Sequence, residues 1–202
     1  MKDINATVIV NLKLNEEEMY NSFPRDIKRG IKKAKNYGLI VKETKVDKDW
    51  EEFYEIYKKT MEEGKTTPKT LDKLKDKTHA FFICKKNEKI IGGGGIWFIP
   101  KYDIKIPRLS FAAFLKEYGK AYPMDILYWN CFLWAKNKNY DKFDLGGWQI
   151  NAKGHLKGIN KFKERWGEIV YYYRNYPLHI AIGRKLVRNF KFFWWLNRKL
   201  KE

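Results

Sequence analysis

Lys163 is a candidate for contact with an anionic substrate because of the segments that surround it. A short strand predicted at Phe143-Asp144-Leu145 is closed by Gly146-Gly147, and a basic helix returns to end in Phe162-Lys163-Glu164-Arg165-Trp166-Gly167. An amine that attacks an acyl group directly needs positioning, together with a cation or N–H donors for the developing oxyanion. Lys163 could supply that cation. The alternative is a surface lysine in an ordinary α/β crossover, which the spacing alone favours.

The sequence shows no pattern for a nucleophilic triad, for paired carboxylates or for metal ligation. The histidines are scattered at His79, His155 and His179, and the two cysteines, Cys84 and Cys131, lie inside apolar runs. We interpret the cysteines as core thiols in a reducing compartment, and we expect no metal site. A transferase of the kind described above needs no tightly bound cofactor.

The composition favours a folded protein with an anionic partner. The 202 residues are 44% hydrophobic and 17% aromatic, enough for one domain with a substantial core, and the net charge is +18. Such a basic excess suits tRNA, a phosphorylated precursor or an anionic membrane surface, although many lysines simply solvate a surface. No apolar run approaches ~18 residues, and the N-terminal run is too short for a signal peptide. We therefore expect a cytoplasmic protein, with peripheral contact to the inner face of the membrane left open.

The first elements predicted from apolar periodicity are a strand over 6–12 and one helix over 15–38. One face of this helix is apolar and the other is basic. Most basic residues on that face are expected to be solvated. The candidates for contact with an anionic substrate are Arg25, Lys28 and Arg29.

Gly92-Gly93-Gly94-Gly95 is interpreted as a bulge or a close backbone approach rather than a phosphate loop, because the strand continues after it. The other elements alternate between strand and helix, with a short helix restarted at Thr67-Pro68 and a central helix that begins at Pro123. The predicted strands cover residues 39–45, 79–85, 89–99, 104–115, 143–145 and 168–173.

This element order, from residue 39 onward, resembles the plan of GNAT acyltransferases, which is an analogy at the level of the fold. Lys116-Glu117-Tyr118-Gly119-Lys120-Ala121 stands just before the central helix. In the GNAT superfamily the pyrophosphate signature, (Gln/Arg)-x-x-Gly-x-(Gly/Ala), stands at this place in the chain. Here its first position is occupied by Lys116 and not by Gln or Arg. The candidate residues for acyl-CoA binding are therefore Lys116, Gly119 and Ala121.

Residues 24–39 read PRDIKRGIKKAKNYGL, and residues 162–167 read FKERWG. These segments resemble the R-x-x-I-R-K-A-x-x-x-G and F-K-x-x-F-G motifs of FemABX-type proteins, with Trp166 in place of the second Phe. Further similar pieces follow in the family's order at 53–60, 123–135 and 140–147, so the resemblance covers roughly residues 6–180. FemABX proteins are peptidoglycan-bridge aminoacyltransferases of the GNAT superfamily, and the similar domain is their second GNAT domain.

The resemblance implies an N-acyltransferase that moves an aminoacyl or acyl group to an amine of a cell-envelope precursor. Its donor would be an aminoacyl-tRNA or, second, an acyl-CoA. In the family, the lysine of F-K-x-x-F-G is implicated in holding the charge of the transferred carbonyl, which implies catalytic roles for Lys163 and Phe162. The remaining residues of the expected substrate site are Asp144, Gly146, Gly147, Tyr128 and Trp166.

We expect one GNAT-like α/β (α+β) domain over residues 1–176, with a mixed, mostly antiparallel sheet flanked by helices. Residues 1–37 would form an N-terminal strand and basic helix, 38–176 the GNAT core, and 177–202 a basic aromatic helix that packs on the domain, on a twin subunit or on a membrane. FemABX proteins usually hold two GNAT domains, and the first contributes to precursor binding, so a sugar-nucleotide or lipid-linked substrate would require another chain or a homodimer to supply that domain. The competing interpretation is a non-catalytic basic module that binds tRNA or an anionic membrane surface.

Overall fold

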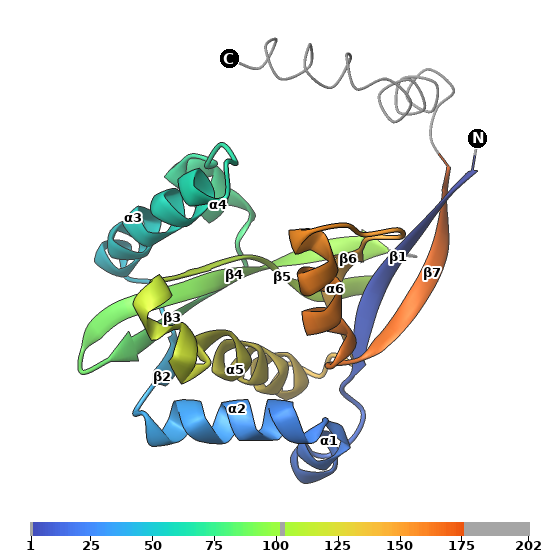
Figure 1. The fold of residues 1–202 in the computed structure, drawn as a ribbon, viewed down its shortest axis with the longest axis horizontal. Helices are drawn as coiled ribbons and strands as arrows, with labels where there is room; N and C mark the ends of the chain where they lie inside the picture. Colours follow the sequence, from blue (N-terminus) through green and yellow to red (C-terminus); the bar gives the residue numbers. More distant parts are fainter. Residues whose placement is uncertain (1, 102–103, 176–202) are drawn as a thin grey trace.

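A seven-stranded sheet with helices on both faces is the framework of the chain (Figure 1). A computed structural model describes residues 2–101 and 104–175. Figure 1 shows α3 and α4 over one face of the sheet, and α5 with α2 over the other. The elements are β1 (Lys2–Asn11), α1 (Glu16–Ser22), α2 (Arg25–Asn36), β2 (Ile40–Glu43), α3 (Asp47–Glu63), α4 (Leu71–Lys77), β3 (Ala80–Lys86), β4 (Lys89–Lys101), β5 (Ile104–Phe114), the 3-10 helix η1 (Lys116–Ala121), α5 (Pro123–Asn137), β6 (Lys142–Trp148), α6 (His155–Glu164) and β7 (Glu168–Asn175).

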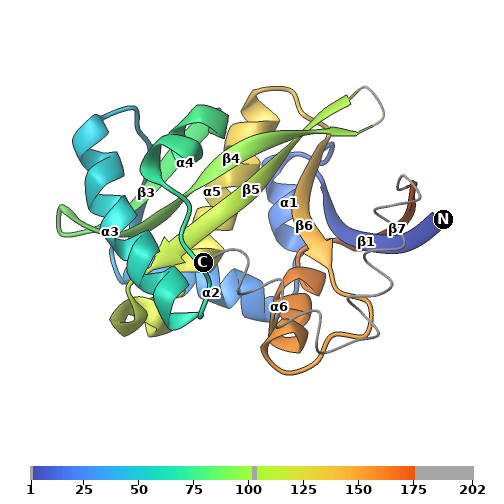
Figure 2. The ribbon, with the colours of Figure 1, turned by 90° about the horizontal axis from the view of Figure 1, so that it is seen from above.

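The strand order is β2-β3-β4-β5-β6-β1-β7, and the neighbouring pairs are antiparallel except for β5 and β6. The predicted mixed, mostly antiparallel sheet flanked by helices is thereby confirmed. In the described strands, β5 and β6 share one bridge, between Arg108 and Asp144. Figure 2 shows the two strands diverging beyond this bridge, with α6 beyond the end of β6. We call this divergence of the two strands the β5–β6 fork; it divides the sheet into a β2–β5 half and a half formed by β6, β1 and β7.

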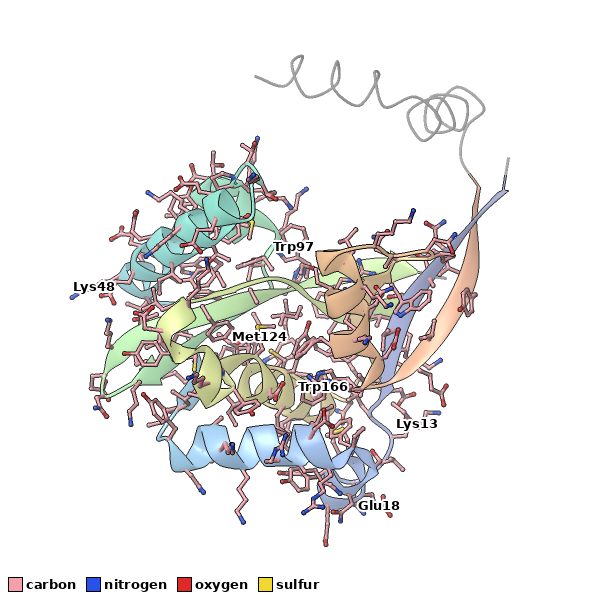
Figure 3. The ribbon with its side chains drawn as sticks, in the orientation of Figure 1. Lys13, Glu18, Lys48, Trp97, Met124 and Trp166 are labelled. Atoms are coloured by element: carbon pink, nitrogen blue, oxygen red, sulfur yellow. The ribbon has the colours of Figure 1, made fainter. Side chains whose placement is uncertain are left out.

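The central strands bury side chains on both faces, with the period of two that a strand imposes. In β3, Phe82 and Cys84 belong to the larger core, which includes α5, whereas Phe81 and Ile83 belong to the smaller core with α3 and α4. Trp166 belongs to the larger core, and Figure 3 shows it inside the molecule where α5 and α6 meet. The end of α6 is therefore part of the main core.

Helix α5 is buried around most of its circumference because it lies between the sheet and α2. Ile126 and Phe132 are buried. Leu127, on the other side of the helix, is completely buried as well. The contact with α2 is close, since a Cβ at Gly30 would lie 2.0 Å from Asp125 Oδ2.

Two helix boundaries differ from the sequence prediction. The basic N-terminal helix is divided into α1 and α2, because Pro24 disfavours a helical conformation at the preceding Phe23, whose ψ is 148°. The short helix α4 begins at Leu71 and not at Pro68. Its capping oxygen comes from the side chain of Thr70, which accepts a hydrogen bond from a first-turn N–H.

The glycine run lies inside β4, and neighbouring groups occupy the places of its missing side chains. A Cβ at Gly93 would lie 2.2 Å from the Phe82 carbonyl oxygen, and one at Gly95 would lie 2.2 Å from Phe111 Cζ. The pairing with β5 shifts register directly after Gly95. The prediction of a close backbone approach with a bulge is therefore confirmed.

Cys84 and Cys131 are both free and buried, in agreement with core thiols. Burial raises the pKa of the Cys84 thiol to about 12, so this thiol stays protonated. Within the part of the chain that the structure describes, no helix combines the length and apolar content that a bilayer crossing requires. The basic aromatic helix predicted over 177–202 lies outside the described residues.

Asp125 is expected to make stability depend on pH. Burial raises the pKa of its carboxyl from 3.8 to about 6, while Arg165 opposes the rise and Asp26 adds to it. Because the folded-state pKa is the higher one, the folded protein binds this proton more tightly. The stabilising contribution is therefore full below pH ~4 and is lost as the pH rises through about 6. Asp125→Asn should remove this part of the pH dependence of the unfolding free energy.

Urea unfolding between about pH 4 and 7 measures the effect. Asp76→Asn, at an exposed position of α4, is the matched control and should leave the pH dependence unchanged. An Asp125→Asn variant with the same pH dependence as the unmodified protein would contradict the prediction.

Candidate active site at the β5–β6 fork

Asp144 is the central residue of the fork and is completely buried. One carboxylate oxygen accepts hydrogen bonds from the Thr7 hydroxyl of β1 and from the Gly146 backbone N–H, the latter at 2.7 Å. The other oxygen lies 2.5 Å from Nη2 of Arg108, on β5. A buried carboxylate needs such donors to remain charged. Asp144 is thus held by three strands, as a fixed part of the floor of the fork.

Lys163 reaches the fork from α6. Its ammonium donates a hydrogen bond to the Gly147 carbonyl at 3.0 Å, and its side chain is half-buried. The backbone at the preceding Gly146 has φ +80°, a left-handed conformation that favours glycine. The structure therefore brings together Lys163, Asp144 and the two glycines that the sequence singled out.

The electrostatics of the fork favour an anion. Burial lowers the pKa of Lys163, the Arg108 charge lowers it further, and Asp144 partly offsets both. Two cationic side chains thus face one carboxylate. An ammonium that has lost part of its hydration interacts more strongly with a neighbouring anion than an exposed one does.

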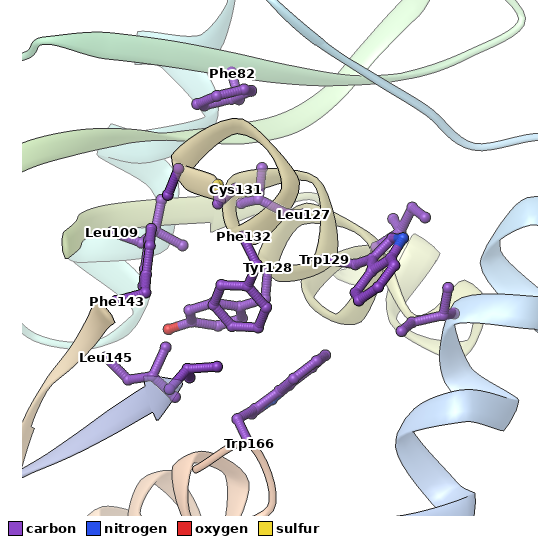
Figure 4. Packing of buried hydrophobic residues seen from close by; sticks show 14 of the residues in the cluster. Phe82, Leu109, Leu127, Tyr128, Trp129, Cys131, Phe132, Phe143, Leu145 and Trp166 are labelled. Carbon is purple, nitrogen blue, oxygen red and sulfur yellow. The ribbon is translucent and has the colours of Figure 1, made fainter. Parts of the chain in front are cut away.

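Aromatic rings hold α6 against α5 (Figure 4). The Trp166 ring centroid lies 5.7 Å from that of Tyr128 and 5.4 Å from that of Phe132. Phe162, the neighbour of Lys163, lies 5.6 Å from Tyr128. Tyr128 and Trp166, both expected to bind substrate, are 5% and 2% exposed. The structure therefore places them in the core behind the fork.

Asn160 fixes α6 to the segment that follows β6. Its side-chain amide accepts from the Gln149 N–H at 3.0 Å and donates to the Gln149 carbonyl at 2.8 Å. The residue is 4% exposed. Because Lys163 lies one helical turn further along α6, this double hydrogen bond also sets the position of the Lys163 backbone.

Arg165 anchors the other end of α6. It donates a hydrogen bond to Asp26 of α2, lies 3.9 Å from Asp125 of α5, and has its guanidinium 5.0 Å from the centre of the Phe162 ring. The hydrogen bond from Arg165 lowers the pKa of Asp26. Lys163 is therefore held between two anchored residues of the same segment.

The basic residues expected to contact an anionic substrate lie on α2. Arg25 and Arg29 are exposed, and Lys28 is half-buried with its ammonium 3.3 Å from the Asn21 carbonyl. Their face of α2 is the solvent side, whereas the fork lies in the sheet. The structure does not bring these three residues together with Lys163.

The segment expected to bind pyrophosphate forms η1, directly before α5. Lys116 pairs with Glu63 of α3 at 2.6 Å. A Cβ at Gly119 would meet nothing within 4 Å, and Ala121 is 6% exposed. A pocket between α3 and this segment includes Thr60, Glu63 and Lys116 in its lining. The segment has the expected place in the fold, but its lysine already has a carboxylate partner.

Arg108 is a residue of the fork that sequence reasoning missed. It follows Pro107 in a largely apolar strand, where an arginine is as a rule assigned to the solvent side. The available signal was a charged residue in β5 and another, Asp144, in the buried strand β6. Nothing local to either strand indicates that the two are neighbours.

The fork offers cations, backbone groups and a buried carboxylate. Among residues 2–101 and 104–175, no group of three or more His, Cys, Asp or Glu side chains is arranged to hold a metal ion. The donors present suit the stabilisation of negative charge on an acyl oxygen.

Known proteins share parts of this sequence and fold. The model of the FemAB family matches residues 2–91, and the crystal structure of FemX matches with a TM-score of 0.68 at 15% identity, over 82% of this chain and 59% of that one. Residues 2–91 are thus similar to the FemAB family, and the fold is similar to that of FemX. The FemAB match covers the segment that begins the resemblance and ends before the fork, whereas the match to FemX extends over most of the fold.

Two further solved structures share the fold of this chain. They are the C-terminal domain of a putative lysylphosphatidylglycerol synthetase from Agrobacterium fabrum (TM-score 0.62, 12% identity, 85% of this chain and 60% of that one) and L-PGS from Bacillus licheniformis (TM-score 0.61, 16% identity, 89% and 64%). No curated protein matches the chain in sequence. At these identities the structural likeness establishes the fold, and the chain spans about three fifths of each solved chain.

Replacing Asn160 should loosen α6. In Asn160→Ala both hydrogen-bonding groups of Gln149 lose their partner, so the unfolding free energy should fall by about 1–3 kcal/mol. Asn160→Asp should destabilise at least as much at neutral pH, because its carboxylate would face the Gln149 carbonyl. Urea unfolding checks both variants. Asn137→Ala, exposed at the end of α5, is the control, and an Asn160→Ala variant as stable as this control would refute the anchoring role.

Proposed function

We propose that this domain transfers an aminoacyl group, or second an acyl group, to an amine of a cell-envelope precursor. The observation that carries the proposal is the Lys163 ammonium, held at the β5–β6 fork by the Gly147 carbonyl. The FemAB match and the FemX-like fold support the same reaction class. Aminoacyl-tRNA is the favoured donor and acyl-CoA the second.

The reaction needs no covalent enzyme intermediate. The acceptor amine attacks the carbonyl carbon of the donor ester or thioester, and a C–N bond forms. The bond to the tRNA ribose oxygen, or to the CoA sulfur, then breaks as the tetrahedral intermediate collapses. The proton lost by the amine is taken up by the leaving oxygen or sulfur. The negative charge that appears on the carbonyl oxygen is the charge that Lys163 stabilises.

The surroundings of Lys163 suit this role. Its ammonium is held by one backbone carbonyl, so it keeps further N–H bonds for the oxyanion. The aromatic cluster behind it, with Phe162 and Trp166, limits water on one side. A fixed donor in a partly dehydrated site needs little reorganisation during the reaction, which is how such sites lower a barrier.

The acceptor and the partners belong to the same proposal. We infer that the chain corresponds to the second of two GNAT domains, because the segments at 24–39 and 162–167 resemble motifs of that domain in FemABX-type proteins. A partner chain or a homodimer then completes the site for the envelope precursor. The net charge of +18 suits a polyanionic donor such as tRNA, and it equally suits contact with an anionic membrane surface.

Lys163→Ala should lower kcat by about 10²–10³-fold, because one donor to the oxyanion is lost, while the unfolding free energy stays close to that of the unmodified protein. Lys157→Ala, on the exposed face of the same helix, is the control and should keep full activity. Turnover measured with a donor and an envelope-precursor amine decides the matter. Unchanged turnover in Lys163→Ala would remove this residue from the mechanism.

The pH profile should fall on its alkaline side earlier than an ordinary lysine would cause. The attacking amine must be neutral, so the rate rises with pH at first. Lys163 must carry its proton, and since burial and Arg108 lower its pKa below 10.5, it loses that proton at a lower pH. In Lys163→Arg, which stays charged at every accessible pH, the alkaline fall should disappear. An alkaline limb that persists in Lys163→Arg would exclude Lys163 as its cause.

The donor is tested with the pure protein and either charged tRNA or acyl-CoA, together with envelope-precursor amines. Loss of the acyl group from tRNA on addition of the amine supports the favoured donor, and loss from CoA supports the second. No transfer from either donor, combined with steeply salt-dependent tRNA binding, would instead support the non-catalytic module.

A further inference from the structure

A space of about one methyl group lies beside Gly146, and both cations of the fork border it. A Cβ built on Gly146 would lie 3.6 Å from Lys163 Nζ, 3.7 Å from Arg108 Cδ and 3.8 Å from Arg108 Nε. Apart from Gly146 itself and its two chain neighbours, no described residue has an atom nearer to that point. The left-handed φ of +80° favours glycine at this position, so the space is kept open by the backbone conformation as well.

Two nitrogen atoms of the Arg108 guanidinium differ in their contacts. Its Nη2 is bound to Asp144 at 2.5 Å. Its Nε is buried, and it has no hydrogen-bond partner among the described residues. A buried N–H without an acceptor is unfavourable, and such groups in native proteins call for an explanation. An acceptor that arrives with the substrate would provide one.

A purely structural role for Arg108 explains only part of this arrangement. The bond from Nη2 to Asp144 is sufficient to join β5 to β6 at their shared bridge. It does not explain why the Nε–H is left without a partner beside Gly146 and a second cation. Those features are expected of a site for a negatively charged oxygen.

We propose that Arg108 is a second catalytic cation, and that the oxyanion of the tetrahedral intermediate lies in the space beside Gly146, between Arg108 Nε–H and Lys163 Nζ. This inference rests on the proposed acyl transfer. Asp144 orients the guanidinium through Nη2 and leaves Nε for the oxyanion. Arg108 and Lys163 carry one positive charge more than Asp144 neutralises, which matches the single negative charge of the intermediate.

The kinetic test compares Arg108→Ala and Arg108→Lys with the unmodified protein. Both should lose about 10²-fold in kcat with little change in KM, and added guanidinium should restore part of the kcat of Arg108→Ala. The effects of Arg108→Ala and Lys163→Ala should not multiply in the double variant, because the two groups share one oxygen. Lys13→Ala removes an exposed ion pair between Lys13 and Asp141, and it should keep full activity.

A structural role alone predicts a different result. Arg108→Ala would then lose stability or substrate binding, with kcat unchanged in the folded fraction and no effect of guanidinium. That result would overturn the proposal.

A second measurement reports on the anion site without turnover. In the unmodified protein labelled with ¹⁵N-arginine, inorganic phosphate stands in for the tetrahedral oxyanion. Its addition should shift the Nε–H resonance of Arg108, assigned by its absence in Arg108→Lys, and Lys163→Ala should weaken the shift. If phosphate shifts this resonance but no donor is used, the acyl-transfer proposal fails while the anion site stands. If transfer occurs but the resonance and the kcat of the Arg108 variants do not change, Arg108 has no catalytic role.

Discussion

A single buried carboxylate joins the two halves of the sheet. Asp144 lies where the parallel strands β5 and β6 touch, and its oxygens take donors from β1, from β5 and from its own strand. A charged group with no exposed surface is tolerable only when its partners are fixed. The two strands of the fork can therefore diverge beyond this point while they stay aligned at their shared bridge. The Asp144 contacts fix the base on which the other groups of the fork are positioned.

The second constraint is the return of the chain through α6. Lys163 is half-buried, so its placement requires that the loss of hydration be offset by contacts elsewhere in the same segment. Asn160 and Arg165 supply polar contacts on either side, and Trp166 adds the apolar contact with the main core. The Lys163 ammonium is thus held in place by the packing of Trp166 in the main core. These contacts position the cation without neutralising its charge.

Local signals in the sequence predicted most helices and strands. Features that depend on contacts across the sheet could not be predicted from the sequence. Residues only a few positions apart in the sequence were enough to recognise the glycine run, the basic face of α2 and the Lys163 segment. Asp144 instead meets Thr7 across 137 positions and Arg108 across 36. No periodicity or cap encodes such pairings, so Arg108 was missed. Tyr128 was expected in the substrate site, whereas the structure places it in the core.

The place of β1 in the sheet also affects how the chain can fold during synthesis. This strand is made before the other strands of the sheet, yet its two neighbours, β6 and β7, are made after all of them. Val8 and Val10, which are buried in the finished fold, have no strand to pair with until then. The nascent chain therefore carries an apolar strand with free edges through most of its translation, a state prone to aggregation and suited to chaperone binding.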